Sequence, residues 1–97
     1  MKPSSSAEAE FTVRAELGLH ARPAGKFVAL AGHYDCEISV AREDEWVSGS
    51  SVLSILSLAA AQGTTLRIRA EGADAEVAVR ELGALLEDPE GGGQGVS

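Results

Sequence analysis

His20 is the residue in this sequence with the clearest capacity for chemistry. It follows Gly18 and Leu19, where an alternating strand-like pattern ends, and it comes directly before a segment with helical spacing over residues 21–32. The first N–H groups of a helix have no partners within the helix and lie at the positive end of its dipole. A side chain at this junction therefore lies beside a potential anion-binding site.

Arg22 points to the same chemistry. A neutral imidazole is a competent nucleophile, and a guanidinium two residues further on can bind phosphate oxygens with its planar array of donors. Together, His20 and Arg22 predict a histidine that accepts a phosphoryl group and holds it beside unpaired N–H groups. Two other interpretations use the same residues. One is a histidine that only caps the start of the helix, and the other is a module that binds an anion without transferring anything.

Periodicity predicts the elements that must position this site. The strand-like segments are residues 11–17, 36–42, 46–47 and 64–70. Helical apolar spacing covers residues 21–32, 52–61 and 75–87, with Ser51 and Asp74 as N-caps of the second and third helices. The order β-α-β-β-α-β-α predicts an α+β fold, in which three helices cover one face of a four-stranded, mostly antiparallel sheet.

Length and composition indicate one domain. The chain has 97 residues, and we assign the domain to residues 8–88, with flexible tails at residues 1–7 and 89–97 that are rich in Ser and Gly respectively. The N-terminus lacks the apolar segment of a signal peptide, and no apolar run reaches the length of a membrane-spanning helix. These features predict a cytoplasmic protein without membrane insertion.

Charge and cysteine content exclude several classes of function. The net charge of −7 disfavours a nucleic-acid-binding module, yet residues 17–34 and 46–70 contain no Asp or Glu. The region around His20 is therefore expected to be neutral or positive. Cys36 is the only cysteine, which excludes an internal disulfide, and the spacing of His20 and His33 does not suit a metal site. We expect no metal and no cofactor.

Several segments resemble one known family. Residues 18–24, Gly-Leu-His-Ala-Arg-Pro-Ala, resemble the active-site signature of the HPr family of histidine-containing phosphocarriers. Residues 47–58 resemble the family's serine-site helix, and residues 62–63 and 71–74 are similar to segments that flank its last strand. The resemblance runs without gaps over residues 11–87. It implies the family's open-faced β-sandwich, with four antiparallel strands under three helices.

The resemblance implies a phosphoryl carrier of the phosphoenolpyruvate-dependent sugar phosphotransferase system rather than an enzyme. His20 would accept phosphate at ring Nδ1 from enzyme I and pass it to the A domain of an enzyme II. Arg22 matches the arginine that neutralises the phosphate. The resemblance also suggests a monomer. A regulatory paralogue, such as a member of the nitrogen-related branch of the system, remains an alternative.

Three further implications concern partners. Ser51 matches the family's regulatory serine, which an HPr kinase/phosphorylase modifies in many bacteria. Leu53 lies off the apolar stripe of its helix, so it is expected to be exposed, and Val52, Leu53 and Lys26 are expected to contact partners. Gly49 and Ser50 depart from the family pattern just before Ser51. These departures bear on recognition by the kinase more than on the chemistry of His20.

Overall fold

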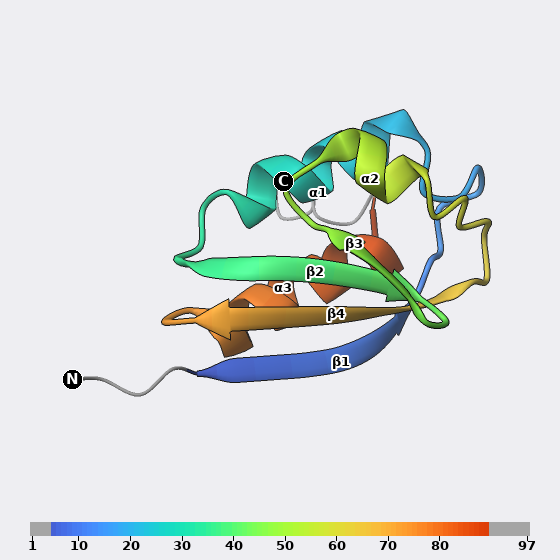
Figure 1. Ribbon diagram of the computed structural model, residues 1–97. Coiled ribbons are helices and arrows are strands. Elements are labelled where there is room, and N and C mark those ends of the chain that lie inside the picture. Colours follow the sequence, from blue (N-terminus) through green and yellow to red (C-terminus); the bar gives the residue numbers. More distant parts are fainter. Residues whose placement is uncertain (1–4, 90–97) are drawn as a thin grey trace.

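Four strands and three helices follow one another as β-α-β-β-α-β-α in the computed structural model, which describes residues 5–89 (Figure 1). The strands are β1 (Ser6–Thr12), β2 (Cys36–Arg42), β3 (Glu45–Ser48) and β4 (Thr65–Gly72). The helices are α1 (Ala21–Ala31), α2 (Val52–Leu56) and α3 (Ala75–Glu87). This order of elements is the one predicted from the sequence.

The strands form one antiparallel sheet in the order β1-β4-β2-β3, and the three helices lie on one of its faces (Figure 1). Side chains alternate between the two faces, so Leu66 and Ile68 of β4 point toward the helices. Leu66 and Ile68 are completely buried there, together with Phe27 of α1 and Leu82 of α3. The predicted fold class is confirmed: an open-faced sandwich with its core between sheet and helices.

The first strand lies earlier in the chain than its sequence pattern suggested. The prediction was residues 11–17, but β1 is Ser6–Thr12, and it pairs along its whole length with β4. After Val13, the N–H of Arg14 donates to the carbonyl of Leu86 at 3.1 Å, so the chain has left the sheet. Ala7 and Ala9 are too weakly apolar to mark a strand in the sequence. Ser6 and Ala7, which were expected in a flexible tail, therefore belong to the sheet, while residues 90–97 of the other predicted tail lie outside the described residues.

The second helix is shorter than its apolar spacing suggested. It was expected to run to residue 61, but α2 ends at Leu56 and Ser57 is its C-cap. Ala59 then has a φ of 51°, in the left-handed region, which a continuing helix does not allow. The change of direction leads residues 58–60 back toward the core, where Leu58 and Ala60 are buried. No helix in residues 5–89 is long and apolar enough to span a membrane.

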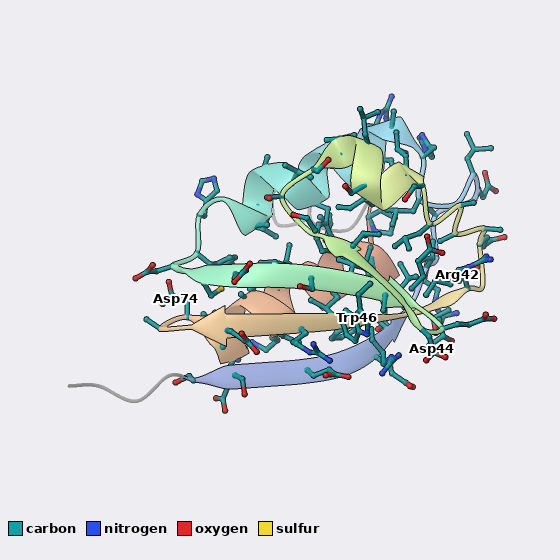
Figure 2. The ribbon with its side chains drawn as sticks, viewed as in Figure 1. Arg42, Asp44, Trp46 and Asp74 are labelled. Carbon is teal, nitrogen blue, oxygen red and sulfur yellow. The ribbon has the colours of Figure 1, made fainter. Side chains whose placement is uncertain are left out.

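Asp74 precedes α3 as predicted, but its side chain does not cap the helix. Its carboxylate instead accepts a hydrogen bond from the backbone N–H of Asp35, at 2.8 Å. Asp35 lies just before β2, and Asp74 lies just after β4, at the same end of the sheet. The carboxylate therefore links two connections at the end of the sheet (Figure 2).

Trp46, labelled in Figure 2, is the centre of a cluster of stacked side chains on the open face of the sheet. The guanidinium carbons of Arg69 and Arg67 lie 4.0 Å and 5.0 Å from the centre of the indole ring. Glu8 of β1 forms ion pairs with the same two arginines, at 3.1 Å and 3.5 Å. Ala41, which is opposite both Trp46 and Arg67 in register, is buried. Cation–π and ionic contacts thus connect the outer strands β1 and β3 across the sheet.

Candidate functional site around His20

The loop between β1 and α1 is held at a fixed distance from the loop after α2. The N–H of Leu19 donates to the carbonyl of Ala60 at 2.9 Å, and the Leu19 side chain is buried. Gly18 has a φ of 75°, and a Cβ atom on it would lie 2.5 Å from the same carbonyl oxygen. Only glycine fits this approach without strain. His20, the next residue, therefore has a backbone that is held in one place.

His20 is the N-cap residue of α1. Its backbone is extended, with φ −86° and ψ −167°, and its carbonyl accepts the first helical hydrogen bond from Ala24 at 3.0 Å. Its side chain does not cap the helix. The imidazole is half-buried, and within residues 5–89 it has no hydrogen bond or ion pair. Both ring nitrogens are therefore available to a ligand or a partner.

The first turn of α1 leaves polar groups for an anion. Pro23 has no N–H, and the N–H of Ala24 is bonded to His20. The N–H groups of Ala21 and Arg22 have no acceptor within the described residues. These two groups lie at the positive end of the helix dipole. The first turn of α1 is free of acidic residues, so no carboxylate from that turn competes for the N–H groups.

His20, Arg22 and Lys26 line one hollow of about 250 Å³. Arg22 and Lys26 are one turn apart on α1, and both are exposed. Leu17 and Pro89 contribute apolar walls, from the loop before α1 and from the residues after α3. Glu16 also lines the hollow. The structure thus brings together three residues predicted from the sequence and places two cations beside the imidazole.

A second hollow, of about 350 Å³, lies on the side of His20 toward α2. It is lined by Leu17, Leu19 and His20 from the first loop, by Leu56 at the end of α2, and by the three alanines 59–61 of the loop after α2. Its lining is apolar apart from the imidazole and the backbone. His20 therefore lies between a cationic hollow and an apolar one, and Leu17 borders both.

Ser51 is the N-cap of α2, as predicted. Its hydroxyl oxygen accepts a hydrogen bond from the N–H of Ser54 at 3.2 Å, and its carbonyl accepts one from Ile55 at 3.1 Å. The residue is half-buried. A serine is favoured here because its oxygen satisfies an N–H group at the helix start. The position has a structural reason to be serine, whether or not it is modified.

Of the residues predicted for docking, Leu53 has 79% of its surface exposed, as expected from its place outside the apolar stripe of its helix. Val52 is half-buried. Neither lines the two hollows beside His20, whereas Lys26 does. Val52 and Leu53 thus lie on α2 outside the lining of the two hollows, although Leu56 of the same helix lines the second one, and α2 contacts α1.

Sequence reasoning missed Leu17 and Pro89. The alternating pattern placed Leu17 on the buried side of a strand, but 79% of its surface is exposed. The glycine directly after it was the available signal, because a chain that turns at Gly18 need not keep Leu17 in the strand. Pro89 was assigned to a tail, and no local pattern predicts that the end of α3 lies beside His20.

Comparisons with known proteins agree with this geometry. Residues 7–88 match the family model described as "PTS HPr component phosphorylation site". The chain belongs to the HPr family. It is 42% identical over 78 residues to the phosphocarrier protein HPr of Pseudomonas aeruginosa, covering 79% of this chain and 87% of the relative. It is 36% identical over 80 residues to the phosphocarrier protein NPr of Shewanella violacea, covering 82% of this chain and 88% of that one.

A solved structure of the family has the same fold. The crystal structure of an HPr from Bacillus anthracis superposes with a TM-score of 0.82 at 32% identity, covering 86% of this chain and 99% of the other. Family membership makes this chain a phosphocarrier of the phosphotransferase system in general terms.

Gly49 and Gly25 have different structural roles. A Cβ on Gly49 would lie 2.5 Å from Cγ2 of Ile38, so the packing of β2 against this loop requires glycine. Gly25 in α1 has nothing within 4 Å of its Cβ position. The site near His20 therefore has space for a side chain at position 25, and the absence of one costs helix stability.

Cys36 is not placed as a nucleophile. It is half-buried on β2, and the pKa of its thiol is raised by burial and by the carboxylates of Asp74 and Asp35. A thiol with a raised pKa is protonated at neutral pH and reacts slowly. Within residues 5–89, no three His, Cys, Asp or Glu side chains are grouped so that they could hold a metal ion.

The two glycines near His20 give a matched test. Gly18→Ala is expected to lower the free energy of unfolding by about 1–3 kcal/mol, because alanine there has a strained φ and contacts the Ala60 carbonyl. Gly25→Ala is expected to raise it by about 0.5–1 kcal/mol, since alanine is the better helix former. Urea denaturation measures both. Equal effects of the two substitutions would contradict the proposed role of Gly18.

Proposed function

We propose that this protein carries phosphoryl groups on His20, which receives them from enzyme I and delivers them to the A domain of an enzyme II. The observation that carries the proposal is the placement at the start of α1 of an imidazole that has no hydrogen bond or ion pair within residues 5–89, in one hollow with Arg22 and Lys26. A nucleophile, two cations and two free N–H groups in one place suit a site that accepts and releases a phosphoryl group.

In the proposed transfer, the lone pair of the His20 ring nitrogen, which the family resemblance assigns as Nδ1, attacks phosphorus. The bond between phosphorus and the phosphorylated group of enzyme I breaks, and its electron pair stays with that group. The phosphoryl oxygens then lie near the guanidinium of Arg22 and the N–H groups at the start of α1, which stabilise their charge. Because Arg22 is exposed, this stabilisation is modest, and the group remains easy to pass on.

Release to a second partner uses the same face. Val52, Leu53 and Lys26 are proposed as docking residues, and such transfers need small interfaces that form and separate quickly. The protein is proposed to be a cytoplasmic monomer. It is a carrier, not a turnover enzyme, because each phosphoryl group leaves it as it arrived.

A regulatory carrier of the nitrogen-related branch is the second candidate. The similarity to the NPr of Shewanella violacea supports it, since the identity to that protein is 36%, close to the values for HPr relatives. Such a carrier would work without a sugar permease. Measuring phosphoryl transfer from the phosphorylated carrier to the A domain of a sugar-specific enzyme II distinguishes the two candidates.

We also propose that Ser51 is a regulatory phosphorylation site. A phosphate there would lie at the N-terminus of α2, where N–H groups such as that of Ser54 favour negative charge. It would also add charge beside the apolar patch of Val52 and Leu53. Both effects would alter partner binding without changing His20.

The first prediction concerns the acceptor residue. Incubation with phosphoenolpyruvate and enzyme I should add one phosphate that is labile in acid and stable in base, measured by intact mass. His20→Ala should abolish it, because it removes the imidazole that lies in the hollow with Arg22 and Lys26. His33→Ala should leave it unchanged, since His33 is exposed and lies beyond the C-terminal end of α1. A phosphate on His20→Ala would overturn the proposal. Binding of phosphate without a covalent adduct on the wild type would favour the anion-binding module instead.

The second prediction concerns Arg22. Arg22→Ala should slow phosphorylation about tenfold without abolishing it, because one charge-assisted contact to the phosphoryl oxygens is lost. Quench-flow kinetics with phosphorylated enzyme I measures the rate. Arg80→Ala is the matched control, since Arg80 is an exposed arginine on α3. If both variants transfer at the wild-type rate, Arg22 is surface charge only.

The third prediction concerns Ser51. ATP and an HPr kinase/phosphorylase should add one acid-stable phosphate to the wild type and none to Ser51→Ala. That variant should also lose about 1 kcal/mol of stability with its N-cap. Ser54→Ala is the control, because it leaves the Ser51 hydroxyl and the cap bond to the backbone intact. Phosphate on Ser51→Ala, or none on the wild type, would contradict the assignment.

A further inference from the structure

Leu17 is an exposed leucine that the fold itself does not use. It has 79% of its surface exposed, a value that it shares with Leu53 among the large apolar residues of the described chain. It lies in a turn closed by the N–H of Gly18 and the carbonyl of Ala15, at 2.9 Å. Such a turn favours a polar residue, because an apolar side chain held in water gains nothing from it. The leucine therefore calls for an explanation outside the chain's own packing.

The position of Leu17 relative to His20 supplies that explanation. Leu17 lines both the cationic hollow and the apolar hollow, and His20 also lines both. A protein whose phosphoryl group reaches the His20 ring must enter at least one of these hollows. Either approach brings the partner's surface over the Leu17 side chain. The turn bond and the buried Leu19 beside it hold the backbone of Leu17 in place before the partner arrives.

The charges around Leu17 define what kind of surface can cover it. Arg22 and Lys26 lie in the cationic hollow, and residues 17–34 and 46–70 contain no carboxylate although the whole chain has a net charge of −7. Glu16 is the one acidic residue among the described lining of the two hollows. The complementary surface is apolar at its centre, with carboxylates arranged to meet the two cations.

We propose that Leu17 is a contact residue for the protein that donates the phosphoryl group to His20. It would insert against an apolar part of the donor, while donor carboxylates approach Arg22 and Lys26. This inference rests on the proposed function of His20. Leu17 contributes to binding in the complex and takes no part in the chemical step, because a leucine offers no group to the phosphoryl oxygens. Its burial also removes water from beside the reacting imidazole.

The test separates binding from chemistry. Leu17→Asn keeps the size and branching of the side chain, replaces its methyl groups with an amide, and suits a turn. With enzyme I and phosphoenolpyruvate, we expect the KM for this carrier to rise about tenfold at nearly unchanged kcat. The reason is that the lost contact stabilises the bound complex and the transition state equally. The rate at which the isolated phosphorylated carrier hydrolyses should not change. Val77→Asn is the matched control, since Val77 is a half-buried apolar residue near the other end of α3.

Each outcome distinguishes this inference from the proposed function. An unchanged KM for Leu17→Asn, with the wild type phosphorylated normally, would overturn the role of Leu17 and leave His20 as the acceptor. A lower kcat at an unchanged KM would also overturn it, because Leu17 would then act on the chemistry. If the wild type takes no phosphate from enzyme I, the proposed function fails and the role of Leu17 fails with it. Circular dichroism of each variant establishes that the fold is retained.

Discussion

The contact between the loop before α1 and the loop after α2 is the constraint on which the site depends. The N–H of Leu19 binds the carbonyl of Ala60, and Gly18 passes so close to the same carbonyl that a Cβ would not fit. The two loops are about 40 residues apart in the chain, and each leads to a helix. Their contact fixes where α1 begins, and it therefore fixes His20 at the start of that helix. It also places the end of α2 beside the imidazole as the wall of a second hollow.

The arginines on the two faces of the molecule differ in whether they have partners within the protein. On the open face of the sheet, Glu8 pairs with Arg67 and Arg69, and both arginines stack on Trp46, so these charges are satisfied within the protein. On the helical side, Arg22 has no ion pair among the described residues and lies in the hollow with His20. A protein with a net charge of −7 thereby presents free positive charge where a phosphoryl group is expected.

A carrier must bind each partner weakly and release the phosphoryl group readily. The geometry around His20 suits this requirement, because Arg22 and Lys26, which line the hollow beside it, are exposed and solvent screens their charges. A deeply buried phosphate site would hold the group more tightly and slow its transfer. Two exposed leucines, Leu17 and Leu53, lie on this side of the molecule, and Leu17 lines both hollows.

The order of elements, the inward side chains of β2 and β4, and the positions of His20 and Ser51 at the starts of α1 and α2 could be predicted from local sequence, because periodicity and capping depend on neighbouring residues. The boundaries of β1 and α2 could not, since alanines at 7 and 9 carry a weak apolar signal and α2 ends where the chain must return to the core at Leu58. Only the tertiary structure decided that Leu17 is exposed, that Pro89 lies beside His20, and that Gly18 must approach Ala60. These features join segments distant in the chain, and no local pattern encodes such a contact.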